Sequence, residues 1–202
     1  MQIGIIGTGN VAQTLARRWL AAGHKITYGS RDPAAKGDLG APVEPLADAV
    51  ANNHVLVNAT PGSASLEIAE EVGAPAFAGK VLVDVANAVT PSFELVYPNS
   101  SLAERLQAAL PQAHVVKTMN TGAMMVMAEP ASVPPSTVFV SGDDAAAKAT
   151  TASLLRDLGW PADSIADLGG VESARGPEHF VLMFSAISRS LGTPKFNIRV
   201  VT

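Results

Sequence analysis

The sequence predicts an α/β protein built on a doubly wound, mainly parallel sheet, with helices on both faces, extra strands toward the C-terminus and a long C-terminal helix. Two features support this prediction. The chain opens with an apolar strand, a glycine-containing turn, an amphipathic helix and a second strand, which together form a βαβ unit. Beyond it, short apolar runs alternate with stretches of helical spacing, as in strands that are buried on both faces of a sheet and joined by right-handed crossovers.

The first βαβ unit follows from the order of its residues. Ile3, Ile5 and Ile6 predict a strand, and apolar residues then recur at helical spacing over residues 11–20. Gly23 is expected to end this helix because glycine takes a positive φ readily. Residues 25–28 begin the second strand.

The turn between the first strand and the helix has the form G-x-G-x-x-A, the Rossmann-like fingerprint with alanine in the third glycine position. Gly7 permits the sharp turn, Gly9 leaves room for a pyrophosphate, and Ala12 keeps the helix close to the sheet. Backbone N–H groups and the positive end of the helix dipole then face the phosphates. We therefore predict that a dinucleotide is bound by the residues of this turn: Gly7, Thr8, Gly9, Asn10 and Val11.

The end of the second strand selects the dinucleotide. NAD-binding units usually place an acid about 20 residues after the glycines to hold the ribose hydroxyls, whereas this strand ends in Ser30 and Arg31. Arg31 can form a forked pair with the 2′-phosphate of NADP, with Ser30 and Lys36 as further donors. Asp32 could still reach a ribose hydroxyl, but Asp32 followed by Pro33 is typical of a turn that caps the next segment. The sequence favours NADP over NAD.

The rest of the chain continues the alternation. After a loop rich in Ala, Gly and Pro, we expect a helix at 45–50, a strand at 54–59, a helix at 65–72, a strand at 80–85, a helix at 102–110, strands at 114–117 and 137–141, a helix at 145–158, a strand at 164–168 and a last helix at 171–191. Asp143 and Asp144 precede a helix, where the dipole favours negative charge. Pro177 requires that the last helix either begins near it or is kinked there.

Composition narrows the class of protein. The 202 residues include 14 basic and 18 acidic side chains, a net charge of −4, with no long basic run, which argues against a nucleic-acid partner. The absence of cysteine excludes disulfides and thiolate chemistry. An early first strand and the lack of an apolar run of about 18 residues predict a cytoplasmic protein without a membrane span. We expect one domain over residues 1–202, with a dinucleotide-binding core at 1–122 and an extension at 123–202.

Ligands of open parallel sheets lie outside the carboxyl ends of the strands. Thr60 and Pro61 follow one predicted strand and either line the adenine or pyrophosphate side of a ligand or simply end the strand. Asn87 and Asn120 follow two others and either offer amides to the nicotinamide or hold turns. Met119 lies beside Asn120 in a methionine-rich stretch that could form a soft wall for a ring, although such stretches are more often core or subunit interface.

Titratable groups at these exits are few. His24, His54 and His114 precede strands or lie between elements at the opposite end of the sheet, so we interpret them as structural, and Asp84 inside a strand as a satisfied structural acid. Arg175, Glu178 and His179 could return to the cleft, although a surface salt bridge is the simpler interpretation. No residue is therefore predicted as a catalytic acid or base, and no metal site is predicted. Hydride transfer to a flavin-like ring mainly requires stacking and alignment.

Several segments together resemble the NADPH:coenzyme F420 oxidoreductase family: residues 7–10, 29–31, 116–121, 142–144, 167–170, and the spaced Ala174, Arg175 and Glu178. The resemblance implies a domain that binds NADP through Thr8, Ser30 and Arg31. It also implies a deazaflavin against the nicotinamide, near the exits of the fourth and fifth strands and the last helix, and a homodimer. The cytoplasmic domains of membrane ferric reductases, which pass hydride from NADPH to flavin, are similar too.

The main hypothesis from the sequence is hydride transfer between NADP(H) and a flavin-type coenzyme, F420 first. The family archetype has a histidine after its fifth strand where this chain has Met119 and Asn120, so FMN or FAD remains open as the acceptor. Reduction of a small imine or ketone is a second hypothesis. A non-catalytic NADP-sensing module is the third.

Overall fold

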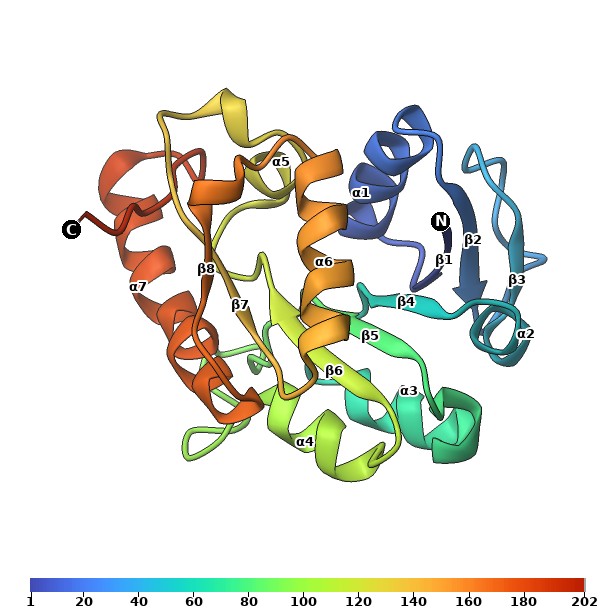
Figure 1. Cartoon of the computed structure of the whole chain (residues 1–202). Helices are drawn as coiled ribbons and strands as arrows, with labels where there is room; N and C mark the ends of the chain where they lie inside the picture. Colours follow the sequence, from blue (N-terminus) through green and yellow to red (C-terminus); the bar gives the residue numbers. More distant parts are fainter. Residues whose placement is uncertain (202) are drawn as a thin grey trace.

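The structure is a computed structural model that describes residues 1–201. Within these residues, all strands join one sheet of eight in the order β3-β2-β1-β4-β5-β6-β7-β8 (Figure 1). The strands are β1 (Gln2–Ile6), β2 (Lys25–Ser30), β3 (Val43–Pro45), β4 (Val55–Asn58), β5 (Val81–Asp84), β6 (His114–Thr118), β7 (Val138–Ser141) and β8 (Ile165–Asp167). The predicted Rossmann-like fold is confirmed.

The described helices are α1 (Asn10–Ala21), α2 (Leu46–Ala51), α3 (Ser65–Val72), α4 (Leu102–Ala109), α5 (Met124–Ala128), α6 (Ala145–Asp157) and α7 (Arg175–Leu191). Short 3-10 turns occur at Ala74–Phe77, Pro130–Ser132, Ala162–Ser164 and Val171–Ala174. None of the helices within residues 1–201 combines the length and the apolar character needed to cross a bilayer.

Two apolar layers sandwich the sheet. On one face, Leu15 and Trp19 of α1 pack with Leu154 of α6, and the Trp19 indole donates a hydrogen bond to the Leu154 carbonyl at 3.1 Å. On the other face, Phe77 and Leu102 lie in a cluster formed with α2, α3 and α4. Figure 1 shows these helices on opposite sides of the strands. Burial on both faces explains why the central strands are continuously apolar.

The order of strands places a crevice at the ends of β1, β2 and β4. From β1 the chain proceeds outward to β2 and β3, then returns to β4 on the other side of β1. Ile6, the last residue of β1, is in register with Gly29 of β2 and with Asn58 of β4. The strand exits that follow therefore lie together at the point where the topology reverses, which is where ligands of such sheets bind.

The last two strands reverse direction. β7 is antiparallel to β6, with Lys117 opposite Ser141, and β8 is parallel to β7. In an antiparallel pair the second strand starts where the first one ends, so the connection from β6 to β7 does not have to cross the sheet. The predicted N-terminus of α6 is confirmed, because the Asp144 side chain caps it by accepting a hydrogen bond from the Ala147 N–H.

Two elements were not predicted. β3 has three residues in the segment we expected to be a loop, and it forms by pairing with the end of β2, where Tyr28 is opposite Val43. α5 spans five residues of the methionine-rich stretch, and Val126 and Met127 are buried in the core while Met125 stays 38% exposed. Both elements are too short to show a period, so tertiary contacts decide them.

The C-terminal helix begins near Pro177, which was one of the two arrangements that the sequence allowed. A 3-10 turn occupies Val171–Ala174, and α7 begins at Arg175, which puts Pro177 in the first turn of the helix. Proline is tolerated there because the first-turn N–H groups have no intrahelical partner. After α7 the chain folds back, and Phe196 stacks on Phe184 with ring centroids 4.9 Å apart.

Candidate dinucleotide-binding site

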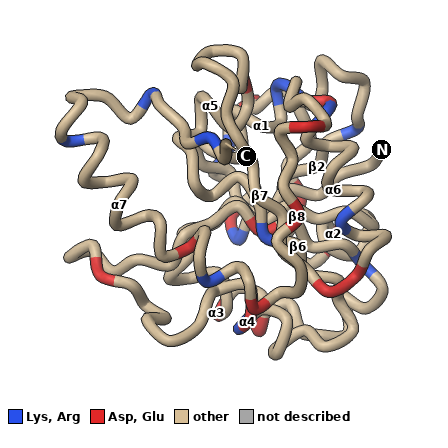
Figure 2. Tube along the Cα trace, turned by 60° about the vertical axis from the view of Figure 1, so that its left-hand side comes forward, with Lys and Arg blue, Asp and Glu red and all other residues tan. Residues whose placement is uncertain are grey.

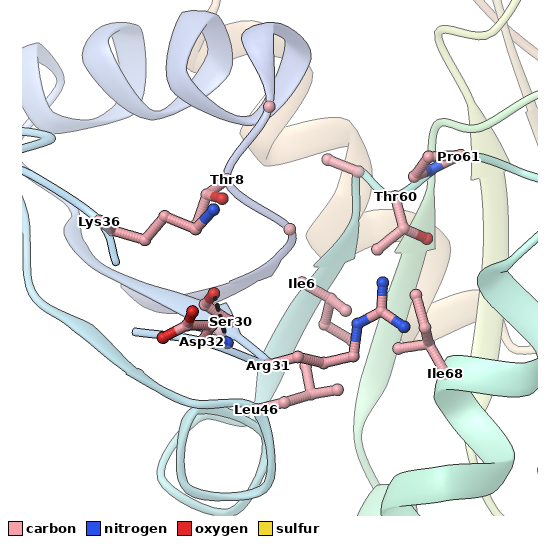
Figure 3. A pocket seen from close by; sticks show the side chains of 14 residues that line it. Ile6, Thr8, Ser30, Arg31, Asp32, Lys36, Leu46, Thr60, Pro61 and Ile68 are labelled. Atoms are coloured by element: carbon pink, nitrogen blue, oxygen red, sulfur yellow. Dashed lines mark hydrogen bonds between the residues drawn. The ribbon is translucent and has the colours of Figure 1, made fainter. Parts of the chain in front are cut away.

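A pocket of about 360 Å³ lies at the carboxyl ends of β1, β2 and β4 (Figure 3). Of the predicted site residues, it is lined by Gly7, Thr8, Gly9, Ser30, Arg31, Lys36, Thr60 and Pro61. Asp32 and five apolar or small residues complete the lining: Ile6, Gly29, Leu46, Ala59 and Ile68. The structure thus brings the glycine turn, the end of β2 and the loop after β4 around one cavity.

The two glycines of the turn differ in what requires them. Gly7 has φ +108°, and a Cβ there would lie 2.9 Å from the Ala59 carbonyl oxygen, so only glycine fits. Gly9 has an ordinary extended backbone at the N-cap of α1, and within the described residues nothing lies within 4 Å of the place where its Cβ would be. The open space at Gly9 is what the approach of a pyrophosphate needs.

The exit of β2 presents cationic and hydroxyl groups to this cavity. The Arg31 guanidinium extends across it toward Thr60 and Ile68, while Lys36 points from the other side toward Thr8 in the view of Figure 3. The Ser30 hydroxyl oxygen accepts a hydrogen bond from the Asp32 N–H at 3.1 Å, so its own proton remains for another acceptor. Together these groups suit a phosphate dianion.

Asp32 is part of a turn, as the sequence indicated. Its carboxylate accepts a hydrogen bond from the Ala35 N–H at 3.2 Å, which caps the segment that follows β2. The carboxylate also lines the pocket, beside Ser30 (Figure 3).

The apolar side of the cavity was missed by sequence reasoning. Leu46 opens α2 and Ile68 lies in α3, and both are mostly buried, 8% and 6% exposed. The sequence placed them only within two predicted helices, at 45–50 and 65–72. The available signal is the position of Ile68 near the start of the helix that follows β4, whose exit lines the crevice, whereas Leu46 follows β3, which the sequence did not predict. They give the pocket an apolar wall next to the Arg31 guanidinium, suited to a flat base.

The remaining predicted site residues lie outside this pocket. Asn10 and Val11 form the first turn of α1, directly after Gly9. The Asn87 amide donates to the Asn120 carbonyl at 2.8 Å, and the Asn120 amide donates to the Asn87 side-chain oxygen at 2.9 Å. These bonds join the exits of β5 and β6. Met119 has φ +60° and is 3% exposed, within the core.

The three histidines that precede strands lie outside the pocket, because none of them belongs to its lining. His24 is buried and lies 3.0 Å from both the Met1 amino group and the Asp157 carboxylate. His114, at the start of β6, is 3.6 Å from Asp144. His54 is exposed immediately before β4. These placements agree with the structural interpretation.

The predicted cluster on the last helix separates into three environments. Arg175 forms a two-point ion pair with Glu104 of α4, at 2.6 and 2.8 Å, near the surface. His179 lies 3.1 Å from the Ser100 carbonyl oxygen. Glu178 is 4% exposed and pairs with Lys117 in the interior. The surface salt-bridge interpretation is therefore right for Arg175 and wrong for Glu178, because α7 turns that side chain into the sheet.

The Arg175–Glu104 pair predicts a pH dependence of stability. The Arg175 hydrogen bonds lower the pKa of Glu104 to about 2, against the opposing effect of burial, with help from Ser101 and Ser100. The folded protein gains this stabilisation above the ordinary glutamate pKa near 4.5 and loses it as the pH falls toward about 2. Glu104→Gln should flatten the pH dependence of urea unfolding between these values. Exposed Glu67→Gln is the control, and an unchanged slope in Glu104→Gln would contradict the expectation.

A buried lysine was not identified as a site residue from sequence. Lys117 of β6 is 1% exposed, and its ammonium lies 2.9 Å from Asp84 and 3.1 Å from Glu178. It also donates to the Ala86 carbonyl. Burial acts to lower the pKa of Lys117, but the two carboxylates outweigh it and raise the pKa above its usual value. The group is thus a charged centre within the sheet.

Comparison with known proteins gives one family model and several relatives. Residues 2–88 match the family described as NADP oxidoreductase coenzyme F420-dependent. The crystal structure of a proposed F420-dependent NADP reductase from Arthrobacter sp. FB24 is 36% identical, with a TM-score of 0.94 and 100% coverage of both chains. Metalloreductase STEAP3 of Rattus norvegicus is 30% identical over 88% of this chain, which spans 36% of the length of that relative.

A more distant structure shares the fold alone. The imine reductase from Myxococcus stipitatus, in complex with NADP+, is 19% identical, with a TM-score of 0.66, over 95% of this chain and 63% of that one.

Proposed function

The chain belongs to the family of coenzyme F420-dependent NADP oxidoreductases, and from this membership we propose that it transfers hydride between NADP(H) and a flavin-type coenzyme, most simply the deazaflavin F420. The end-to-end similarity to the Arthrobacter protein supports F420 as the partner. We also propose that residues 1–202 act as one domain, with the dinucleotide core at 1–122 and the extension at 123–202.

The observation that supports NADP most directly is the group of donors at the exit of β2. In the proposed complex, the 2′-phosphate lies between the Arg31 guanidinium, the Ser30 hydroxyl and the Lys36 ammonium, which all line one pocket. Arg31 supplies the planar fork that a phosphate accepts, and Lys36 supplies a second positive charge. Asp32 is held by the Ala35 N–H and serves the turn.

The same proposal assigns the rest of the dinucleotide. The pyrophosphate lies over Gly9, where the structure leaves space, and accepts hydrogen bonds from backbone N–H groups of Thr8, Asn10 and Val11 at the start of α1. The adenine lies against the apolar wall of the pocket. The nicotinamide then extends past Thr60 and Pro61 toward Asn87, Met119 and Asn120, at the exits of β5 and β6.

Bound together, the two coenzymes supply the redox chemistry, which is passage of a hydride from one ring to the other. The protein residues bind and orient. Arg31 and Ser30 fix one end of the dinucleotide, the turn at Gly9 fixes its middle, and the loops after β4, β5 and β6 set the face on which the acceptor ring stacks. No side chain of this chain is assigned as an acid or base.

The proposal is tested by mixing the protein with NADPH and F420, FMN or FAD and following the absorbance of NADPH. We expect oxidation with F420, and a much slower reaction when NADH replaces NADPH. Turnover with FMN or FAD and none with F420 would overturn the choice of acceptor. NADPH binding without turnover with any of the three would contradict hydride transfer and favour a sensing module.

We further propose that the protein is a homodimer through α7. Leu182, Met183 and Leu191 on this helix are 43, 58 and 57% exposed, and residues 179–188 include no Lys, Arg, Asp or Glu (Figure 2). Large apolar side chains grouped on one helix are typical of an interface. Sedimentation should show a dimer, and Met183→Glu should shift it toward monomer. A monomeric wild-type protein at high concentration would contradict the proposal.

A further inference from the structure

Hydrogen bonds connect α7 to the loop after β4 through the interior of the sheet. Glu178 of α7 contacts Lys117 of β6 at 3.1 Å, and Lys117 contacts Asp84 of β5 at 2.9 Å. Asp84 accepts a hydrogen bond from the Asn58 amide of β4 at 2.8 Å, and Asn58 accepts one from the Thr60 hydroxyl at 2.7 Å. The first four residues are at most 4% exposed, whereas Thr60 lines the dinucleotide pocket.

We call this chain of five residues the relay: Glu178, Lys117, Asp84, Asn58 and Thr60. The charges of its members fix the direction of each hydrogen bond. An ammonium only donates, and so does the Ala86 N–H, which also reaches Asp84 at 3.2 Å. Asp84 therefore acts as an acceptor. It must face the nitrogen of the Asn58 amide, which leaves the amide oxygen facing Thr60.

This polarity determines how Thr60 sits at the pocket. Its hydroxyl donates inward to Asn58 and lies 2.8 Å from the Ser65 hydroxyl, which in turn donates to the Pro61 carbonyl. The Thr60 methyl group is left beside the glycine turn, 3.4 Å from the place where a Gly7 Cβ would be. The Thr60 hydroxyl is therefore engaged with the side chains of Asn58 and Ser65, and the Ser65 hydroxyl holds the backbone of the loop after β4 at Pro61.

The same ammonium holds the neighbouring loop. Lys117 donates to the Ala86 carbonyl, at the exit of β5. The next residue, Asn87, lies so close to Gly62 of the β4 loop that a Cβ at Gly62 would overlap the Asn87 carbonyl oxygen. Both loops beside the proposed nicotinamide path are thus anchored to one buried charge.

We propose that Asp84 and Lys117 are positioning residues for dinucleotide binding: they orient the Asn58 amide, and through it the Thr60 loop that forms one wall of the NADP pocket. The inference rests on the proposed function, because it concerns the geometry of that site. Neither residue touches the dinucleotide.

A double-mutant cycle on NADPH affinity tests this. Asp84→Asn keeps the shape of the side chain but replaces one of its two acceptor oxygens by an NH2 donor, so that position 84 can no longer accept from both Lys117 and Asn58. Thr60→Val keeps the shape of threonine but removes its hydroxyl. Each should raise the Kd for NADPH by about tenfold, and the double variant should raise it no further than one single variant, because both changes break the same path. Asp157→Asn, which alters the His24 contact at the other end of the sheet, is the matched control and should leave the Kd unchanged.

The outcomes separate the two proposals. Wild-type protein that does not bind NADPH overturns the proposed function. Wild-type protein that binds, with Asp84→Asn lowering stability but leaving the Kd unchanged, or with the two substitutions acting additively, overturns the positioning role alone. If Asp84→Asn does not fold, Asn58→Leu takes its place in the cycle, because it interrupts the relay and leaves the Lys117–Asp84 pair intact. Non-additivity with Thr60→Val is then the expected result, and additivity contradicts the proposal.

Discussion

Replacing Arg31 with alanine should weaken NADPH binding by about 1.5–3 kcal/mol, roughly 10- to 150-fold, the range for hydrogen bonds to a charged group. NADH binding should change little. In the proposed complex the only group to which Arg31 donates hydrogen bonds is the 2′-phosphate, which NADH lacks, and the guanidinium spans the pocket toward Thr60 and Ile68. Arg31→Lys should lie between wild type and alanine, since it keeps the charge and loses the fork.

Fluorescence titration with each dinucleotide measures this directly. Arg18→Ala, on the exposed face of α1, removes the same charge away from the pocket and serves as the matched control. Titrations at two salt concentrations separate a general loss of positive charge from the loss of a specific fork. Equal losses for NADPH and NADH in Arg31→Ala would show that the arginine does not read the phosphate.

Replacing Lys117 with methionine should lower the free energy of unfolding by about 3–5 kcal/mol, because removing one partner of a buried ion pair leaves its counter-charge uncompensated. Here two carboxylates, those of Asp84 and Glu178, lose their shared cation. Glu178 keeps the N–H groups of Leu102 and Ala103, at 2.7 and 3.0 Å, and Asp84 keeps Asn58. These remaining hydrogen bonds do not replace the positive charge that both carboxylates lose.

Denaturant unfolding monitored by circular dichroism gives the change. Lys148→Met is the matched control: Lys148 pairs with Asp167 at 2.8 Å near the surface, and such pairs contribute about 0–1 kcal/mol. A Lys117→Met protein as stable as the Lys148→Met control would mean that the interior accommodates the two carboxylates by other means.

How much could be predicted varies along the chain. The first βαβ unit was predictable because strand, turn and helix each have a local signal, and α3 was predicted to the residue, Ser65–Val72. β3 was not, because three residues that include Pro45 form a strand only by pairing with the end of β2. α5 was missed because it is short and its neighbours, not its period, bury it.

The pocket was predictable where residues immediately follow strands. Gly7, Ser30, Arg31 and Thr60 could be placed at one edge by the rule for parallel sheets alone. Lys117 could not be assigned a role, because its environment depends on the register that sets it opposite Asp84 and on α7 returning from 61 positions later along the chain to supply Glu178. No local sequence pattern predicts a contact between residues so far apart in the chain.

The two glycines of the N-terminal turn are under different evolutionary constraints. Gly7 is required by the fold, since any larger residue there collides with a backbone carbonyl whether or not a ligand is bound. At Gly9 the described residues leave open space, so only the pyrophosphate of the proposed complex requires a glycine there. A homologue that no longer binds a nucleotide could therefore replace Gly9 and still fold, but it would have to keep Gly7. Loss of the second glycine alone would then mark a relative that has lost its ligand.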